Sequence, residues 1–144
     1  MHGYSEDQLV KNRAVVVVWG AGEADRRAWA SEAARALDPL GGLLEVNEPS
    51  LLTRALEKAR GVVYVPDAAQ LPADVQRELV RTLHEREERP KVVLGLAQSP
   101  DTALSKGLWR DDLHHSLARG RVDLNDPAVK ASRARRNKGE KSRK

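Results

Sequence analysis

The segment Ala14–Trp19, in which four valines precede the tryptophan, constrains the fold of this chain more than any other part of the sequence. Consecutive β-branched residues are typical of a strand that is covered on both faces, as in the parallel sheets of α/β proteins. Gly20-Ala21-Gly22 follows at once, and an alanine-rich helical pattern then covers residues 24–37 until Asp38-Pro39 interrupts it. A strand, a glycine turn and a helix predict a βα unit.

The same alternation of strand and helix continues along the chain. Helices are predicted at residues 49–60, 72–88 and about 108–117, and further strands at 43–46, 62–65, 91–96 and 121–124, the last as an edge strand. Strands that alternate with helices favour a mainly parallel sheet with helices on both faces. The chain has 144 residues, of which 40% are hydrophobic, enough to bury the core of a single domain.

The basic residues are concentrated at the end of the chain. Eight Lys or Arg and one acid give residues 128–144 a net charge of +7, which leaves about −3 on residues 1–127. Because this tail is almost without apolar residues, we expect it to be disordered. We therefore predict a flexible N-terminus over residues 1–12, an α/β domain over 13–127 and a disordered basic tail over 128–144.

The composition also limits the cellular compartment and the kinds of metal or disulfide site that we expect. The chain has no cysteine, which excludes disulfides and thiolate zinc sites, and its longest apolar run is too short to cross a bilayer. We expect a cytoplasmic protein without membrane contact. His114 and His115 are adjacent and do not share a helix face, so no metal site is predicted there.

The loop after the first strand is the usual phosphate-binding position of such folds. Against the P-loop pattern GxxxxGK[ST], Gly20 matches the first glycine, but Asp25, Arg26 and Arg27 stand at the second glycine, the lysine and the Mg²⁺-binding hydroxyl. Arg26 could attract an anion at the helix N-terminus, although its planar head does not replace the lysine. A tight turn from strand to helix needs glycine whether or not it binds a ligand, and we favour this explanation of Gly20 and Gly22 over nucleotide binding.

The later part of the chain is similar to a known family. Gly61–Pro72 (GVVYVPDAAQLP) resembles the stretch GTLFLDEIGELP of the AAA+ domain of sigma-54-dependent transcriptional activators, the bacterial enhancer-binding proteins. Val75–Glu87 (VQRELVRTLHERE) is similar to the helix MQAKLLRVLQERE that follows in that family, and Lys106–Leu117 (KGLWRDDLHHSL) to EGRFREDLYYRL. Glu45–Asn47 fits the family's AVNC strand. The resemblance spans about residues 14–127 and implies a three-layer αβα, P-loop NTPase-like AAA+ fold.

The resemblance also implies that the catalytic residues are lost. Pro66 stands where the family has its magnesium-binding Asp, Asp67 where it has the catalytic Glu, and Ala97 at the sensor Asn. Arg110 keeps the first of two arginine fingers, and Ser116 replaces the second. The stretch between the second and third strands is too short for the GAFTGA loop that contacts sigma-54, and the basic tail stands where the family continues into its helical lid.

These features predict a non-catalytic regulatory module that binds a protein partner, either an AAA+ protein or a second copy. Activators of this family work as rings in which each subunit presents its arginine finger to its neighbour, so Arg110 is a candidate interface residue. No catalytic residue and no obligatory cofactor are predicted.

Two alternatives remain open from the sequence. One is a weak ATP-binding switch or residual ATPase that uses a degenerate nucleotide site made of Gly20, Gly22, Arg26 and Asp67. The other is a nucleic-acid-binding accessory protein acting through tail residues Arg133, Arg135, Arg136 and Lys138, because basic side chains near phosphates release counterions independently of base sequence.

Overall fold

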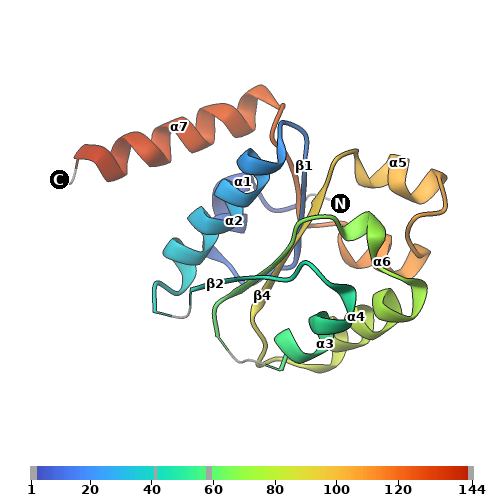
Figure 1. Cartoon of the computed structure of the whole chain (residues 1–144). Helices are drawn as coiled ribbons and strands as arrows, with labels where there is room; N and C mark the ends of the chain where they lie inside the picture. Colours follow the sequence, from blue (N-terminus) through green and yellow to red (C-terminus); the bar gives the residue numbers. More distant parts are fainter. Residues whose placement is uncertain (1–2, 41, 58–59, 143–144) are drawn as a thin grey trace.

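The computed structural model describes residues 3–40, 42–57 and 60–142 (Figure 1). Five strands form one sheet in the order β2-β3-β4-β1-β5, and every neighbouring pair is parallel. The strands are β1 (Val16–Trp19), β2 (Leu43–Glu45), β3 (Val62–Val65), β4 (Lys91–Leu96) and β5 (Arg121–Asp123). The predicted α/β fold with a five-stranded parallel sheet is confirmed, and the fifth strand is an edge strand as expected.

Helices cover both faces of the sheet (Figure 1). One face is covered by α1 (Glu6–Lys11), α2 (Glu23–Leu37) and α7 (Pro127–Ser142). The other face is covered by the 3₁₀ helix η2 (Ala68–Gln70) together with α3 (Leu52–Ala55), α4 (Ala73–Glu85), α5 (Pro100–Ser105) and α6 (Asp111–Ser116). A second 3₁₀ helix, η1 (Pro49–Leu51), precedes α3 and has no buried residue. The result is a three-layer αβα domain.

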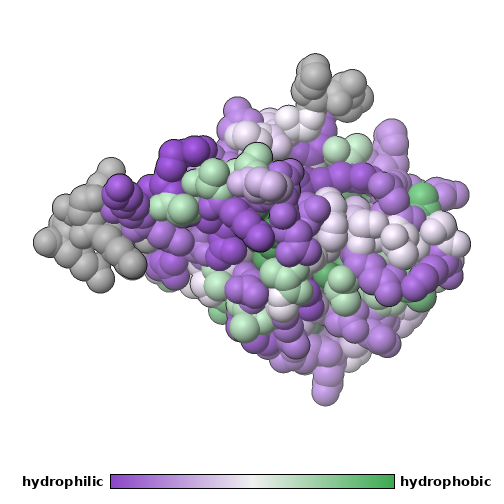
Figure 2. Space-filling model, turned by 90° about the horizontal axis from the view of Figure 1, so that it is seen from above, coloured by the Kyte–Doolittle hydropathy of each residue, from purple (hydrophilic) through white to green (hydrophobic). Residues whose placement is uncertain are grey.

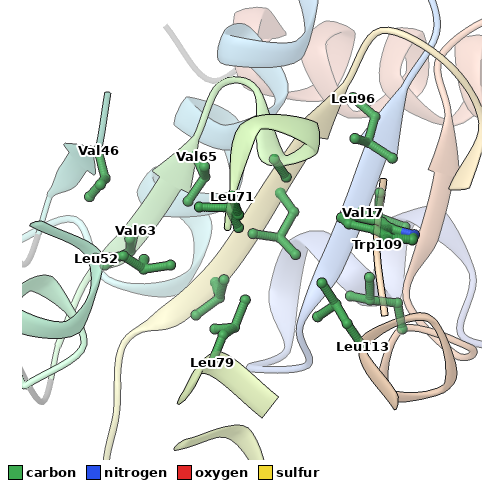
Figure 3. Close-up of a cluster of buried hydrophobic side chains, with 14 of the residues drawn as sticks. Val17, Val46, Leu52, Val63, Val65, Leu71, Leu79, Leu96, Trp109 and Leu113 are labelled. Atoms are coloured by element: carbon green, nitrogen blue, oxygen red, sulfur yellow. The ribbon is translucent and has the colours of Figure 1, made fainter. Parts of the chain in front are cut away.

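The core therefore consists of two apolar clusters, one on each face of the sheet. Successive strand residues point to opposite faces, so Val17 joins one cluster whereas Val16 and Val18 join the other. Figure 3 shows the cluster under α3, α4 and α6, to which Leu52, Leu79 and Leu113 contribute. Burial on both faces explains why the strands are continuously apolar in sequence.

The N-terminal segment differs from its prediction. Residues 1–12 were expected to be flexible, but α1 forms within them, and residues 1–2 lie outside the described part of the chain. Ser5 and Gln8 form a capping box at its start, with Gln8 N to Ser5 Oγ at 3.2 Å and Ser5 N to Gln8 Oε1 at 2.9 Å. Leu9 and Val10 are fully buried against α2 and the sheet. A cap and two buried side chains outweigh the cost of ordering a short polar helix.

The basic tail differs as well. The segment from residue 128 was expected to be disordered, but α7 runs to Ser142, and residues 143–144 lie outside the described part. Val129 is buried in the cluster beneath α1 and α2, and Arg133 and Arg136 form ion pairs with Glu32 and Glu6. The prediction of disorder considered only the low apolar content of the tail, whereas these ion pairs hold the helix against the domain.

The remaining differences are local. The helix predicted over residues 49–60 is divided into η1 and the short α3, which end by Ala55 among the described residues. Helix α5 was not predicted, and Ser99 caps it by accepting a hydrogen bond from Thr102 N at 3.2 Å. Within the described ranges, none of the helices combines the length and hydropathy that a bilayer crossing requires.

Candidate functional site

The turn between β1 and α2 is shorter than a P-loop. Strand β1 ends at Trp19 and α2 begins at Glu23, so only Gly20–Gly22 connects them. In the eight-residue P-loop pattern the helix follows the loop, whereas here it begins at the fourth position. Residues 25–27, which align with the second glycine, the lysine and the hydroxyl of the pattern, therefore lie inside the first turns of α2.

Two consecutive residues of this turn have left-handed backbone conformations. The φ angle is 78° at Gly20 and 51° at Ala21. A Cβ atom at Gly20 would lie 2.8 Å from Asp123 Oδ1 and 2.9 Å from Asn125 Nδ2, so side chains at the end of β5 also require glycine there. Ala21 adopts the conformation at a cost of about 1–2 kcal/mol. The backbone and its crowded surroundings account for Gly20 without a ligand.

The side chains of this turn bond to the turn itself. Arg26 is only 8% exposed, and its Nη1 donates to the carbonyl oxygens of Gly20 at 3.2 Å and Ala21 at 3.1 Å. The Asp25 carboxylate accepts a hydrogen bond from Gly22 N at 3.2 Å. The basic side chain and the backbone N–H that could have bound a phosphate oxygen are thus both engaged within the protein.

A pocket of about 230 Å³ lies at the carboxyl ends of β2 and β3. Its polar lining consists of Glu23, Asn47, Asp67 and Gln70, and none of the described residues that line it is basic. Two carboxylates would repel a polyphosphate. Nearby, Arg27 pairs with Glu45 at 2.6 Å and with Glu23 at 3.0 Å, and its hydrogen bond lowers the pKa of the Glu45 carboxyl.

The four residues of the predicted nucleotide site consequently fall into two groups. Gly20, Gly22 and Arg26 lie together in the turn, whereas the exposed Asp67 follows β3 and lines the acidic pocket with Glu23. Pro66, at the position of the magnesium-binding acid, has no side-chain oxygen to offer a cation. These residues do not fit magnesium and a triphosphate in the manner of a P-loop NTPase.

Arg110 lies elsewhere, as the N-cap residue of α6. Its Nε and Nη2 donate to the two carboxylate oxygens of Asp112 at 2.9 and 3.1 Å, and these bonds lower the pKa of Asp112. The Arg110 side chain is 37% exposed. The structure places Arg110 on the surface but holds its side chain against a neighbour in the same helix.

Gln76, which the sequence analysis did not single out, fixes the backbone before Arg110. It is 2% exposed; its Oε1 accepts from Arg110 N at 2.7 Å, and its Nε2 donates to Leu71 O at 2.7 Å and Leu108 O at 3.0 Å. A groove of about 460 Å³ lies here, lined by Gln76, Ala73, Leu71 and residues 107–110. The signal available in the sequence was a polar residue within the apolar stripe of α4.

The sheet and its helices define the class: a P-loop NTPase-type α/β domain in which β1 lies between β4 and β5 and its glycine turn opens α2. Within that class, the chain has the fold of the AAA+ domains of sigma-54 activators. No family model matches the sequence, and no curated protein matches it.

Solved structures carry this conclusion. The P-loop NTPase domain of a sigma-54 transport activator from E. coli matches with a TM-score of 0.68 and 15% identity, over 82% of this chain and 95% of that one. NtrX from Brucella abortus in complex with ATP matches with a TM-score of 0.67 and 18% identity, over 83% of this chain and 33% of NtrX. A DNA polymerase III gamma subunit-related protein from Thermotoga maritima gives 0.60 and 15%, over 85% and 45% of the two chains. The chain thus spans about a third of the length of NtrX.

Proposed function

We propose that this chain is a non-catalytic regulatory module that retains the AAA+ fold of sigma-54 activators and acts by binding an AAA+ subunit. The observation that carries the proposal is the position of Arg26, whose guanidinium bonds to the carbonyls of Gly20 and Ala21 where an NTPase would hold phosphate. A site that bonds to itself must first break those bonds before it can hold an anion.

The chemistry of phosphoryl transfer supports the same proposal. Such catalysis depends on cations, a metal and oriented donors placed around the transferred phosphate. Here Arg26 and Asp25 are engaged in the turn, Pro66 replaces a metal ligand, and the adjoining pocket contributes Glu23 and Asp67. The described side chains offer negative charge where the reaction requires positive charge.

The surface around Arg110 supports a protein partner. The hydrogen bonds of Gln76 hold the loop before α6. In that loop Arg110 lies near Leu108, which is 41% exposed, and both line the groove against α4. Arginine beside exposed apolar surface is characteristic of protein interfaces. In the family the corresponding arginine faces the neighbouring subunit, so we assign the AAA+ partner to this surface.

One observation favours the alternative of an ATP-binding switch. The buried Nε of Arg26 has no hydrogen-bond acceptor among the described residues, so this nitrogen has an unused N–H donor. Calorimetric titration with Mg·ATP, alongside the emission of Trp19 at the end of β1, separates the two functions. We expect neither heat nor a saturable change up to millimolar nucleotide, with an active sigma-54 activator domain as positive control. Saturable binding below millimolar concentration would establish the switch instead.

The partner is tested by mixing the chain with an AAA+ domain of a sigma-54 activator and following mass photometry and ATPase rate. We expect mixed assemblies and an altered ATPase rate. Arg110→Ala should weaken both effects, whereas Arg54→Ala, an exposed arginine on α3, should leave them unchanged. Absence of association, or equal effects of the two variants, would contradict the proposal.

A further inference from the structure

One face of helix α7, the anchoring face, packs against α1 and α2. Ser132 Oγ donates to Glu6 Oε1 at 2.6 Å, Arg133 Nη2 pairs with Glu32 at 2.5 Å, and Arg136 pairs with both acids at 2.8 and 2.9 Å. The side chains of Glu6 and Glu32 are 4% and 6% exposed. Arg133 and Arg136, which the sequence suggested as nucleic-acid contacts, therefore serve to dock the helix.

The opposite face of α7 is exposed and basic. Helical spacing separates the anchoring positions from five residues that are all exposed in the structure: Lys130, Ala131, Ala134, Arg135 and Lys138. Among these five residues, the three side chains longer than a methyl group are cationic. In Figure 2, seen from above, the coloured surface beside the grey atoms at the left, where α7 lies in Figure 1, is mostly hydrophilic with a few pale green patches.

The surroundings add further positive charge. Arg35 on α2 is exposed and lies one helical turn beyond Glu32, the residue against which α7 docks. Residues 128–144 contain eight basic residues and one acid. Of the acids that pair with α7, Glu6 and Glu32 are buried, whereas Asp7, which lies 3.4 Å from Arg136, is half-exposed. The outer face of α7 therefore carries a net positive charge, from Lys130, Arg135 and Lys138.

We propose that this outer face binds the phosphate backbone of nucleic acid without reading base sequence. From Lys130 to Lys138 the helix rises about 12 Å, a length over which a duplex presents several phosphates. Ala131 and Ala134 leave room for the backbone to approach between the basic side chains. Because docking already orders the helix, binding does not have to supply that ordering free energy.

The composition of this face favours nucleic acid over a membrane surface. An interfacial helix needs bulky apolar side chains such as Leu, Phe or Trp to insert between lipids, and the outer face offers only alanines besides its cations. Counterion release from a polyphosphate requires positive charge alone. The experiment must therefore distinguish binding to nucleic acid from binding to an anionic lipid surface.

The experiment measures fluorescence anisotropy of labelled duplexes of about 20 base pairs with the full chain, across about 50 to 300 mM KCl. Two unrelated DNA sequences test whether binding depends on base sequence, and one RNA duplex tests whether it depends on the sugar. We expect equal affinity for the two DNA sequences and a linear dependence of log K on log salt, with a slope of about −0.9 for each phosphate contacted.

Lys130→Gln/Arg135→Gln should weaken binding roughly tenfold and reduce the salt slope by about 2. The matched control is Arg77→Gln/Arg81→Gln, which removes two exposed cations from α4 in the opposite layer, and it should bind like the parent chain. Circular dichroism checks that both variants keep their helices. Equal weakening by both double variants, no binding at the lowest salt, or binding only to anionic phosphatidylserine vesicles would overturn the proposal.

Discussion

Arg136 near the end of the chain and Glu6 near its beginning form a bidentate ion pair. Nη1 and Nη2 of the arginine donate to Oε1 and Oε2 of the carboxylate, each at 2.8 Å, and the two side chains are 11% and 4% exposed. Trp29 Nε1 donates to the same carboxylate at 2.6 Å. Through these contacts α1, α2 and α7 form one layer, so the α1–α2 layer supports the helix whose outer face we assign to nucleic acid.

Arg136→Gln should destabilise the protein by about 3–5 kcal/mol, because it leaves Glu6 and Glu32 buried without their shared cation. Arg135→Gln changes the preceding residue, which lies on the exposed face, and its free energy of unfolding should stay within about 0.5 kcal/mol of that of the parent chain. Urea unfolding followed by circular dichroism measures both values. Equal stability of the two variants would show that the ion pair does not hold α7.

The same cluster should make the protein sensitive to acid. Burial raises the pKa of Glu6, but hydrogen bonds from Arg136, Ser132 and Trp29 outweigh it and lower the pKa below the ordinary value of 4.5. A carboxyl with a lowered folded-state pKa stabilises the protein above its unfolded pKa, and this contribution is lost as pH falls through the folded value. Unfolding free energy measured from pH 6 downward should fall less steeply in Glu6→Gln than in the parent chain. Identical slopes would argue against this role of Glu6.

Lys91, at the start of β4, should give a pH dependence of the same sign in a higher pH range. It is fully buried, its Nζ donates to Asn12 O at 2.8 Å and Ala14 O at 2.6 Å, and burial with Arg89 and Arg13 nearby lowers its pKa to about 7. Above pH 7 the unfolded chain holds a proton that the folded chain releases, so stability should rise with pH by at most about 1.4 kcal/mol per unit. Chemical unfolding between pH 7 and 9 measures this slope. Lys91→Met should remove it, and a slope that persists in the variant would assign it to another group.

Ala21→Gly should stabilise the protein by about 0.5–1 kcal/mol, because glycine relieves the left-handed strain at some cost in unfolded-state entropy. Ala30→Gly, within α2 and fully buried, should destabilise it by at least about 1 kcal/mol. Thermal unfolding of the two variants gives the comparison. A destabilised Ala21→Gly would mean that the alanine methyl group makes contacts that the strain argument omits.

The elements with continuous local patterns were predictable from the sequence. The third and fourth strands were predicted at residues 62–65 and 91–96 and occupy those residues, and α2 and α4 begin within one residue of their predicted starts. Buried parallel strands and amphipathic helices have hydrophobic patterns that can be recognised from residues close together in the sequence. The family motifs likewise identified the AAA+ fold, which the solved structures confirm.

The candidate site was only partly predictable. The sequence named Gly20, Arg26, Asp67 and Arg110, but not the bonds that decide what each can do. A motif comparison aligns Arg26 with a lysine, whereas its contact with the turn depends on α2 beginning at Glu23, inside the aligned motif. Gln76 was not identified because its partners lie on another loop up to 34 residues away.

The amino-acid sequence by itself determined the positions of the five strands along the chain and the concentration of positive charge at one end of it. Tertiary structure alone decided that this end is a docked helix and that the turn after β1 bonds to itself. The physical reason is sequence separation: periodicity and composition describe residues that are close in sequence, whereas Arg136 and Glu6 are 130 residues apart and meet only in the folded domain.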